Sequence, residues 1–163
     1  MGSRGVLFAI TAAQSQRLLS ASDDDDVMSV IEEIEEAWDE PNLAETDKAW
    51  DAIHRALTDG ELSWDNGSAP LNQAILGGRR IYRRDDYIAV YKSADEVKAI
   101  DAALAAISDD ALADRYRSIV PRDYAPEYGD EDRAYTVEWF SGVRAFYRTA
   151  AASGRSVLFT ADQ

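Results

Sequence analysis

The sequence has no cysteine and a single histidine among its 163 residues. Without cysteine the chain cannot form disulfide bonds, thiolate nucleophiles, zinc fingers or iron–sulfur clusters. One histidine cannot supply a His-rich metal site, and the sequence contains neither an H-E-x-x-H motif nor a G-x-S-x-G nucleophile elbow. We therefore expect no metal and no cofactor.

Long apolar runs are missing as well. The longest uncharged stretch near the start covers residues 5–16, which is well short of the ~20 apolar residues that a membrane-spanning helix needs. No small-residue cleavage site follows it. Together with the absence of cysteine, which fits a reducing compartment, this predicts a cytoplasmic protein with no membrane partner.

Basic residues are scarce relative to acidic ones. The chain has 17 Lys and Arg and 31 Asp and Glu, which give a formal net charge of −14. A field of this sign repels nucleic-acid phosphates, so we expect no nucleic-acid partner. Solubility is the simplest explanation of the excess acid. The same charge would also steer a basic protein toward this one, and a basic protein is therefore the partner we consider.

Length and composition are those of one soluble domain. Hydrophobic residues make up 46% of the chain and charged residues 29%. A domain of this size buries roughly two-thirds of its unfolded-chain surface, so its core needs no covalent staples. We expect a single domain over residues 1–163, present as a monomer or a weak dimer.

Short runs of β-forming residues lie near both ends and in the middle of the chain. They predict strands at residues 6–10, 79–83, 87–91 and 156–160, and the two end strands are expected to pair at the sheet centre. Helical spacing of apolar residues predicts helices between them, the longest at residues 27–38, 47–59, 93–107 and 130–152. The pattern predicts an α+β fold, with a small mixed or antiparallel sheet of about three to five strands covered by several helices.

Polar residues and breakers mark the expected helix ends. Thr11 is a predicted N-cap, and Ser93 with Glu96 forms a predicted capping box. The acids Asp23–Asp26 would complement a helix dipole, and they lack the alternation and the glycine of a calcium loop. Pro41 is expected to end the helix that follows these acids, and Gly60 is a predicted C-cap.

The only histidine, His54, lies three residues after Asp51 in a predicted helix, so the two side chains could meet. An imidazole oriented by a carboxylate can act as a general base, which makes Asp51 and His54 the catalytic candidates. The simpler interpretation is structural. His54 borders the apolar face formed by Trp50, Ile53 and Leu57, where a paired histidine completes a helix boundary.

Arginines follow the Gly77-Gly78 pair at positions 79, 80, 83 and 84. Guanidinium groups grip phosphate or carboxylate in a bidentate manner, so Arg79 and Arg80 are candidates for an anion clamp. Alternatively these arginines protect a strand edge or pair with Asp85 and Asp86. No phosphate loop or dinucleotide fingerprint accompanies them.

Most aromatic residues recur at helical spacing and are explained as core. Trp64, Tyr124 and Tyr128 instead lie in predicted loops. We expect these three side chains to line a pocket or a contact surface.

Several segments in linked order are similar to the YfbM-like family of small bacterial proteins, a domain of unknown function. Residues 47–58, DKAWDAIHRALT, resemble its D-K-x-W-D-x-x-H-x-x-L-T signature. Residues 70–78, 112–116 and 146–158 resemble its later elements, whereas residues 6–8 and 123–129 and the Asp59 inserted before Gly60 depart from it. The resemblance implies an α+β fold in a bacterial cytoplasmic protein and implies no established activity.

Three hypotheses follow from these observations. The first is a non-catalytic, acidic domain that binds a basic protein, in the manner of an immunity protein or inhibitor. The second is a small-molecule-binding protein or enzyme that uses an Asp51–His54 pair, the arginine clamp and Trp64 as a wall. The third is a purely structural or accessory domain.

Overall fold

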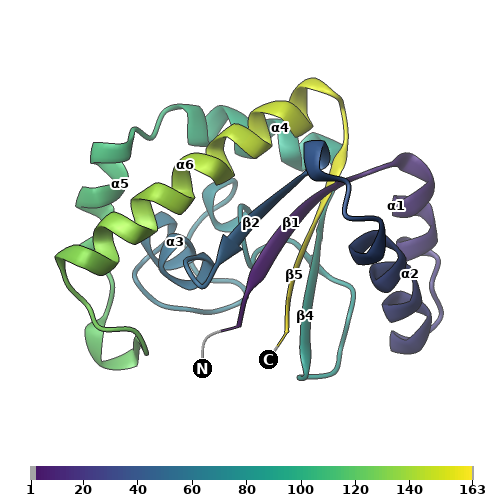
Figure 1. The fold of residues 1–163 in the computed structure, drawn as a ribbon, viewed down its shortest axis with the longest axis horizontal. Helices are drawn as coiled ribbons and strands as arrows, with labels where there is room; N and C mark the ends of the chain where they lie inside the picture. The colour runs from purple at the N-terminus through teal and green to yellow at the C-terminus, as the bar shows by residue number, and fades with distance from the viewer. Residues whose placement is uncertain (1–2, 163) are drawn as a thin grey trace.

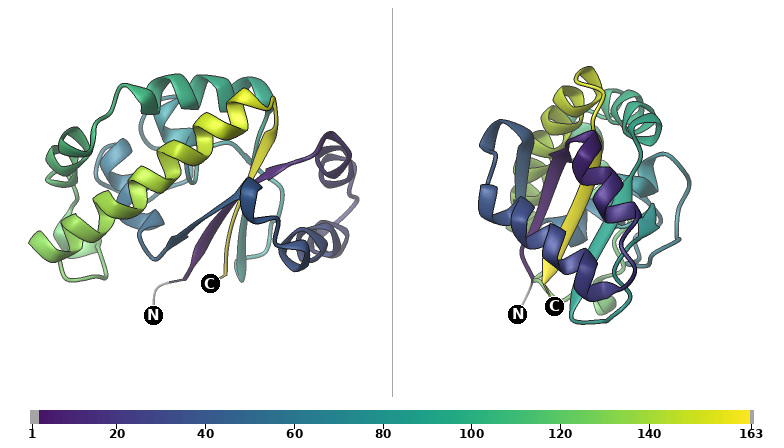
Figure 2. Two further views of the ribbon diagram at one scale, coloured as in Figure 1. Left: turned by 45° about the horizontal axis from the view of Figure 1, so that its top comes forward. Right: turned by 90° about the vertical axis from the view of Figure 1, so that its right-hand side faces the viewer.

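The computed structural model describes residues 3–162, which form a five-stranded antiparallel sheet with helices on both faces (Figures 1 and 2). The strand order is β2-β1-β5-β4-β3. The strands are β1 Gly5–Ile10, β2 Leu43–Asp47, β3 Arg79–Arg80, β4 Tyr87–Lys92 and β5 Ser156–Asp162. The helices are α1 Ala12–Leu19, α2 Asp24–Ala37, α3 Trp50–Leu57, α4 Ala94–Ala105, α5 Asp109–Tyr116 and α6 Asp130–Ala152. Three short 3-10 turns are η1 Glu40–Asn42, η2 Leu71–Gln73 and η3 Pro121–Asp123.

The first and last strands lie side by side at the middle of the sheet (Figure 1). β1 pairs antiparallel with β5 from Gly5↔Ala161 to Ile10↔Ser156 without a break in register. The predicted pairing of the end strands is therefore confirmed, and so is the predicted α+β class.

Strand alternation divides the core into two layers. On β5, Val157 and Phe159 join the core under α3, α4, α5 and α6, whereas Leu158 joins the core under α1 and α2. Figure 2 shows α1 and α2 together on one face of the sheet, with α6 and α4 on the other. Because it is covered on both faces, β5 is apolar on both.

Several predicted helix ends are confirmed. Thr11 and Ser93 both form complete capping boxes, and Asp23 accepts a hydrogen bond from the Asp26 amide. The acids Asp24–Asp26 occupy the first turn of α2, where they complement its dipole. No helix within residues 3–162 is long and apolar enough to cross a bilayer.

The strand predicted at residues 79–83 is shorter than expected, since β3 covers only Arg79–Arg80. Two predicted helix boundaries are also wrong, and both lie beside β2. The helix of residues 47–59 begins only at Trp50, because Asp47 ends β2 with a left-handed backbone (φ 47°) that no helix continues. The preceding helix ends at Ala37, before Pro41, because Trp38 is also left-handed (φ 41°). β2 itself was not predicted, since LAETD has little β-forming character.

The end of α3 requires a glycine. Gly60 has φ +92°, and a Cβ there would lie 1.9 Å from the backbone oxygen of Ser118. Its amide donates to Arg55 O, and its carbonyl accepts from the Val120 amide. Gly60 therefore joins α3 to the segment that follows α5.

We expect Gly60→Ala to destabilise the protein by about 3 kcal/mol or more, since it combines a left-handed backbone with a collision. Gly154→Ala is the matched control, because Gly154 has φ +69° but open space around its Cβ. It should cost about 1 kcal/mol from conformational strain alone. Urea unfolding followed by tryptophan fluorescence measures both, and equal losses would contradict the close approach at Ser118.

Candidate functional site

His54 lies in the core rather than in an open pocket, with an exposed fraction of 1%. Its Nε2 atom is 2.8 Å from the side-chain oxygen of Asn66, and its Nδ1 atom has no hydrogen-bond partner among residues 3–162. Burial lowers the pKa of His54 below its ordinary value. Burial thus favours the neutral form of the ring, and a substrate has no direct access to it.

The predicted Asp51–His54 pair is not formed. Asp51 instead accepts a hydrogen bond of 2.6 Å from Nε of Arg55, one helical turn later. The spacing of four residues favours this pair on the same helix face, while His54 faces the loop that carries Asn66. The geometry therefore does not provide a carboxylate-oriented base.

Arg55 organises a buried polar cluster at one end of the molecule. Its Nη2 atom donates to Asp123 O at 2.9 Å, and its guanidinium lies 5.4 Å from the centre of the Tyr124 ring. The hydroxyls of Tyr124 and Tyr116 both donate to Asp132, at 2.7 and 2.5 Å. These bonds connect α3, α5 and α6 through η3.

The two tyrosines predicted to line a pocket or a contact surface differ in their surroundings. Tyr124 is buried, and its hydroxyl donates to Asp132. Tyr128 is 36% exposed and stacks on Tyr116 with ring centres 4.9 Å apart. Only Tyr128 presents a free ring face to a partner.

Lys92 is a buried cation that sequence reasoning missed. It ends β4 fully enclosed, and its Nζ atom donates to Ile75 O at 2.5 Å. The carboxylate that interacts electrostatically with Lys92 is that of Glu96, which accepts hydrogen bonds from the Gln73 side chain and from the Ser93 amide. Burial lowers the pKa of Lys92 well below its ordinary value. A lysine at the end of the run YIAVYK reads as a solvated strand end, so the sequence carried no signal of this burial.

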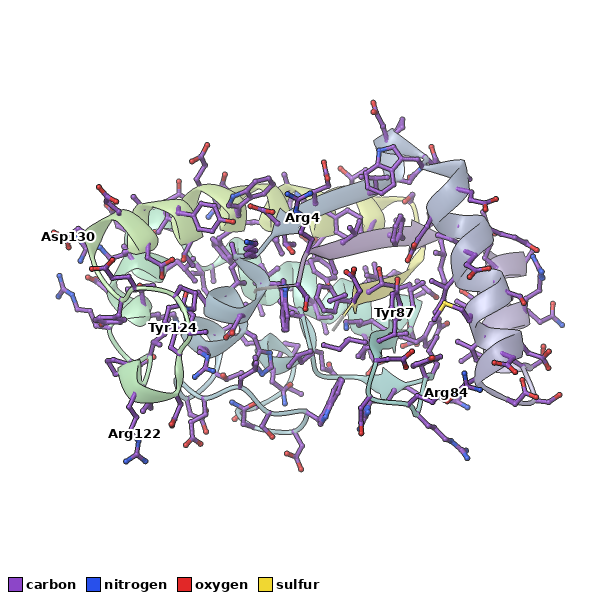
Figure 3. All side chains as sticks on the ribbon, turned by 60° about the horizontal axis from the view of Figure 1, so that its bottom comes forward. Arg4, Arg84, Tyr87, Arg122, Tyr124 and Asp130 are labelled. Atoms are coloured by element: carbon purple, nitrogen blue, oxygen red, sulfur yellow. The ribbon has the colours of Figure 1, made fainter. Side chains whose placement is uncertain are left out.

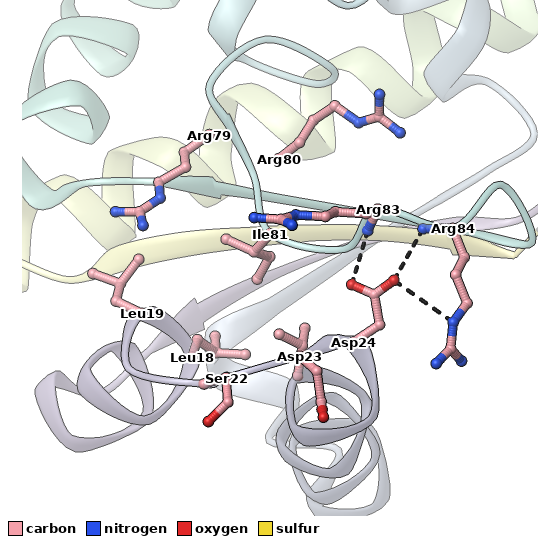
Figure 4. A pocket seen from close by; sticks show the side chains of 12 residues that line it. Leu18, Leu19, Ser22, Asp23, Asp24, Arg79, Arg80, Ile81, Arg83 and Arg84 are labelled. Atoms are coloured by element: carbon pink, nitrogen blue, oxygen red, sulfur yellow. Dashed lines mark hydrogen bonds and ion pairs between the residues drawn. The ribbon is translucent and has the colours of Figure 1, made fainter.

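The predicted anion clamp is divided between the two faces of the sheet. Arg80 lies over the ring of Trp64, with its guanidinium carbon 3.8 Å from the ring centre. Arg79, its neighbour on β3, projects to the side of α1 and α2 (Figure 4). Adjacent strand residues point to opposite faces, so Arg79 and Arg80 direct their guanidinium groups apart, although both border one hollow.

The predicted site residues consequently do not form one site. Tyr124 lies at one end of the molecule and Arg84, near the other arginines, at the opposite end (Figure 3). Arg80 contacts Trp64, whereas the hydrogen bond of His54 goes to Asn66. Within residues 3–162 no group of three or more acidic or histidine side chains is arranged to hold a metal ion.

The most distinctive surface feature is an open groove of about 540 Å³ between β2 and α6, which we call the acidic groove. Its charged and aromatic lining consists of Trp38, Glu40, Glu45, Glu138 and Trp139. None of the three glutamates forms an ion pair with any residue that the structure describes, and no basic residue lines the groove.

Local structure explains how the two tryptophans reach this groove. The left-handed backbone at Trp38 turns its ring away from α2 and against the edge of Phe8, with ring centres 6.1 Å apart. This leaves Trp38 38% exposed. Trp139 comes from α6, which the sequence placed in the core, and its ring meets Tyr135 edge-on at 6.3 Å.

A separate hollow of about 620 Å³ lies at the N-terminal end of α6, where Tyr135 contacts Trp139 of the acidic groove. It is lined by Glu127, Tyr128, Gly129, Asp130, Glu131, Asp132 and Tyr135. Arg133 pairs with Asp130 at its rim, at 3.2 Å. Acids and aromatic rings therefore line both hollows.

Comparison with known proteins agrees with this architecture. A family model described as a domain of unknown function (DUF1877) matches residues 1–160. The chain belongs to the DUF1877 family. The crystal structure of YfbM from Escherichia coli, a protein of unknown function, is similar to this DUF1877 domain with a TM-score of 0.70 and 19% sequence identity, covering 97% of this chain and 99% of that chain. No curated protein matches the chain. The predicted resemblance to YfbM-like proteins is confirmed.

We expect His54→Ala to lower the unfolding free energy of this DUF1877 domain by about 2–3 kcal/mol at pH 7, since it leaves a cavity and an unpaired Asn66 oxygen. The loss should shrink between pH 7 and pH 5. Burial lowers the pKa of His54 in the folded protein, so between pH 7 and pH 5 the histidine of the wild type gains a proton when the protein unfolds. Acidification therefore destabilises the wild type, whereas the alanine variant has no such group. Urea unfolding at both pH values tests this, and a loss that grows on acidification would mean that the folded ring accepts the proton.

We expect Lys92→Met to stabilise the DUF1877 domain by about 1–3 kcal/mol at pH 7, since an apolar side chain avoids the desolvation of the amine. The gain should diminish as pH rises toward about 10, where unfolded lysine also loses its proton. Exposed Lys98 supplies the control Lys98→Met. Thermal unfolding at pH 7 and 9.5 distinguishes them, and a pH-independent loss of stability would contradict the cost assigned to burial.

Proposed function

We propose that this protein is a non-catalytic binding module that takes a basic segment of another protein into the acidic groove between β2 and α6. The observation that supports the proposal is the groove's lining, in which two tryptophans flank three glutamates that have no cation of their own. Such a lining suits a lysine or arginine side chain. The aromatic faces and carboxylates both attract the cation, and the apolar stem packs against the rings.

The position of the groove favours an extended ligand. β2 is an edge strand that pairs with β1 on one side, and edge strands accept a further strand through backbone hydrogen bonds. Glu45 lies on this strand, and Glu138 faces it from α6. A segment that passes along β2 would place alternate side chains between the two acids.

The charge of the whole molecule supports the same kind of partner. With a net charge of −14, the protein attracts a basic chain from a distance and repels acidic ones. The hollow at the N-terminal end of α6 adds four more acids, Glu127, Asp130, Glu131 and Asp132, beside the exposed ring of Tyr128. The alternative of a small-molecule enzyme lacks comparable support, because His54 is buried and Asp51 is bonded to Arg55.

A defined basic peptide tests the proposal. We expect a peptide of four Arg-Ala repeats to bind at 0.15 M salt, whereas four Glu-Ala repeats should not, as measured by isothermal titration calorimetry and tryptophan fluorescence. Glu45→Gln with Glu138→Gln should weaken binding by at least about tenfold, since the loss falls on the contact itself. Glu32→Gln with Glu36→Gln changes two exposed acids of α2 and the net charge equally. This control should weaken binding by less than about twofold.

Gly142→Leu tests the groove without changing charge. Gly142 lines the groove on α6, and a Cβ there would meet no atom within 4 Å. Leucine also favours the helix more than glycine does, so the fold should be retained. The added side chain should block the peptide as strongly as the double glutamine variant. If Gly142→Leu binds like wild type and both charge pairs weaken binding equally, the peptide senses only the overall field and the proposal is wrong.

A further inference from the structure

A third hollow, separate from the acidic groove and from the hollow at Tyr135, lies between the α1–α2 connection and the segment around β3 (Figure 4). Its volume is about 350 Å³. Leu18, Leu19 and Ile81 supply apolar surface, while Arg79 and Arg83 project into the same region from the opposite wall (Figure 4). We call it the arginine hollow.

The arginines around this hollow are not equivalent. Arg84 is held by Asp25 at 2.9 Å and by Asp24 at 3.7 Å. Arg79 and Arg83 have no carboxylate within 4.0 Å among residues 3–162. The hollow is therefore lined by two arginines, Arg79 and Arg83, whose charge no carboxylate of the described residues pairs with.

The carboxylates that line the hollow are already engaged. Asp24 accepts hydrogen bonds from the backbone amides of Arg83 and Arg84, at 3.0 and 3.1 Å. Asp23 accepts the Asp26 amide as the N-cap of α2. These bonds fix the chain after β3 to the first turn of α2. They hold the backbone of Arg83 at the hollow without engaging the guanidinium group of Arg79 or of Arg83.

From this arrangement we infer that the arginine hollow binds a phosphate monoester that carries an apolar substituent. Two guanidinium groups supply the paired donors that a phosphate dianion accepts. The exposed Leu19, together with Leu18 and Ile81, supplies the surface on which the substituent lies. Binding has to come from these local contacts, since the field of the whole protein repels anions.

Phenyl phosphate is the probe for this site, with inorganic phosphate as the anion control and benzyl alcohol as the neutral aromatic control. In a titration followed by two-dimensional NMR, phenyl phosphate should shift the amides of residues 18–24 and 79–84. Inorganic phosphate should shift the same amides at higher concentration, and benzyl alcohol should not. The inference is wrong if phenyl phosphate leaves these residues unmoved or binds no more tightly than inorganic phosphate.

Charge-matched variants locate the site. Arg79→Gln with Arg83→Gln should weaken phenyl phosphate binding by at least about tenfold. Arg117→Gln with Arg122→Gln changes two other exposed arginines by the same charge and should leave binding within about twofold. Leu19→Ala should weaken binding of phenyl phosphate but not of inorganic phosphate. Equal losses in the two arginine pairs would assign the effect to net charge and overturn the inference.

The two ligands can be separated in one protein. Arg79→Gln with Arg83→Gln should still bind the Arg-Ala peptide, and Gly142→Leu should still bind phenyl phosphate. The two binding measurements can therefore contradict one proposal while leaving the other unaffected.

Discussion

The antiparallel pairing of β1 with β5 is the constraint on which the rest of the structure depends. Six consecutive residue pairs, from Gly5↔Ala161 to Ile10↔Ser156, bring the two ends of the chain into the middle of the sheet. Because β5 is then covered on both faces, its alternating side chains support one core under α1 and α2 and another under the remaining helices. The groove beside β2 and the hollow beside β3 lie toward the opposite edges of this sheet.

Inside the molecule, polar groups serve the architecture. Arg55 joins α3 to η3, His54 holds the loop at Asn66, and Lys92 reaches the backbone before β3. Each is buried and bonded within the described chain, at a cost in desolvation that apolar side chains would not incur. On the surface, by contrast, some charged groups have no oppositely charged partner among the described residues. These are the glutamates of the acidic groove at one edge of the sheet, and Arg79 and Arg83 near the other edge. These are the places where a partner can supply what the protein lacks.

The fold was largely predictable because its signals are local. Apolar runs, caps such as Thr11 and Ser93, and the stripe on α6 each act within a few residues. The errors lie where tertiary contacts prevail. β2 is an edge strand of weak propensity, and Trp38 turns outward on a left-handed residue that no sequence pattern marks. The same two features form part of the acidic groove, so the sequence did not predict this site. Trp64, Arg79 and Arg80 were predictable candidates because they lie in a loop or directly after the Gly77-Gly78 pair. The Asp51–His54 pair failed because Arg55, four residues after Asp51, reaches the carboxylate.

The central place of β5 also determines when the protein can fold. Of the five strands, β5 is the last to leave the ribosome, so β1 and β4 emerge with no neighbour between them. Until β5 pairs with them, the edges of β1 and β4 that face β5 have unpaired backbone groups. Unpaired strand edges of this kind are prone to aggregation and are bound by chaperones. Pairing across about 150 residues of sequence is slow, because the chain must close a long loop before the contact forms. The two central pairings of the sheet, of β5 with β1 and with β4, can therefore form only after β5 has been synthesised.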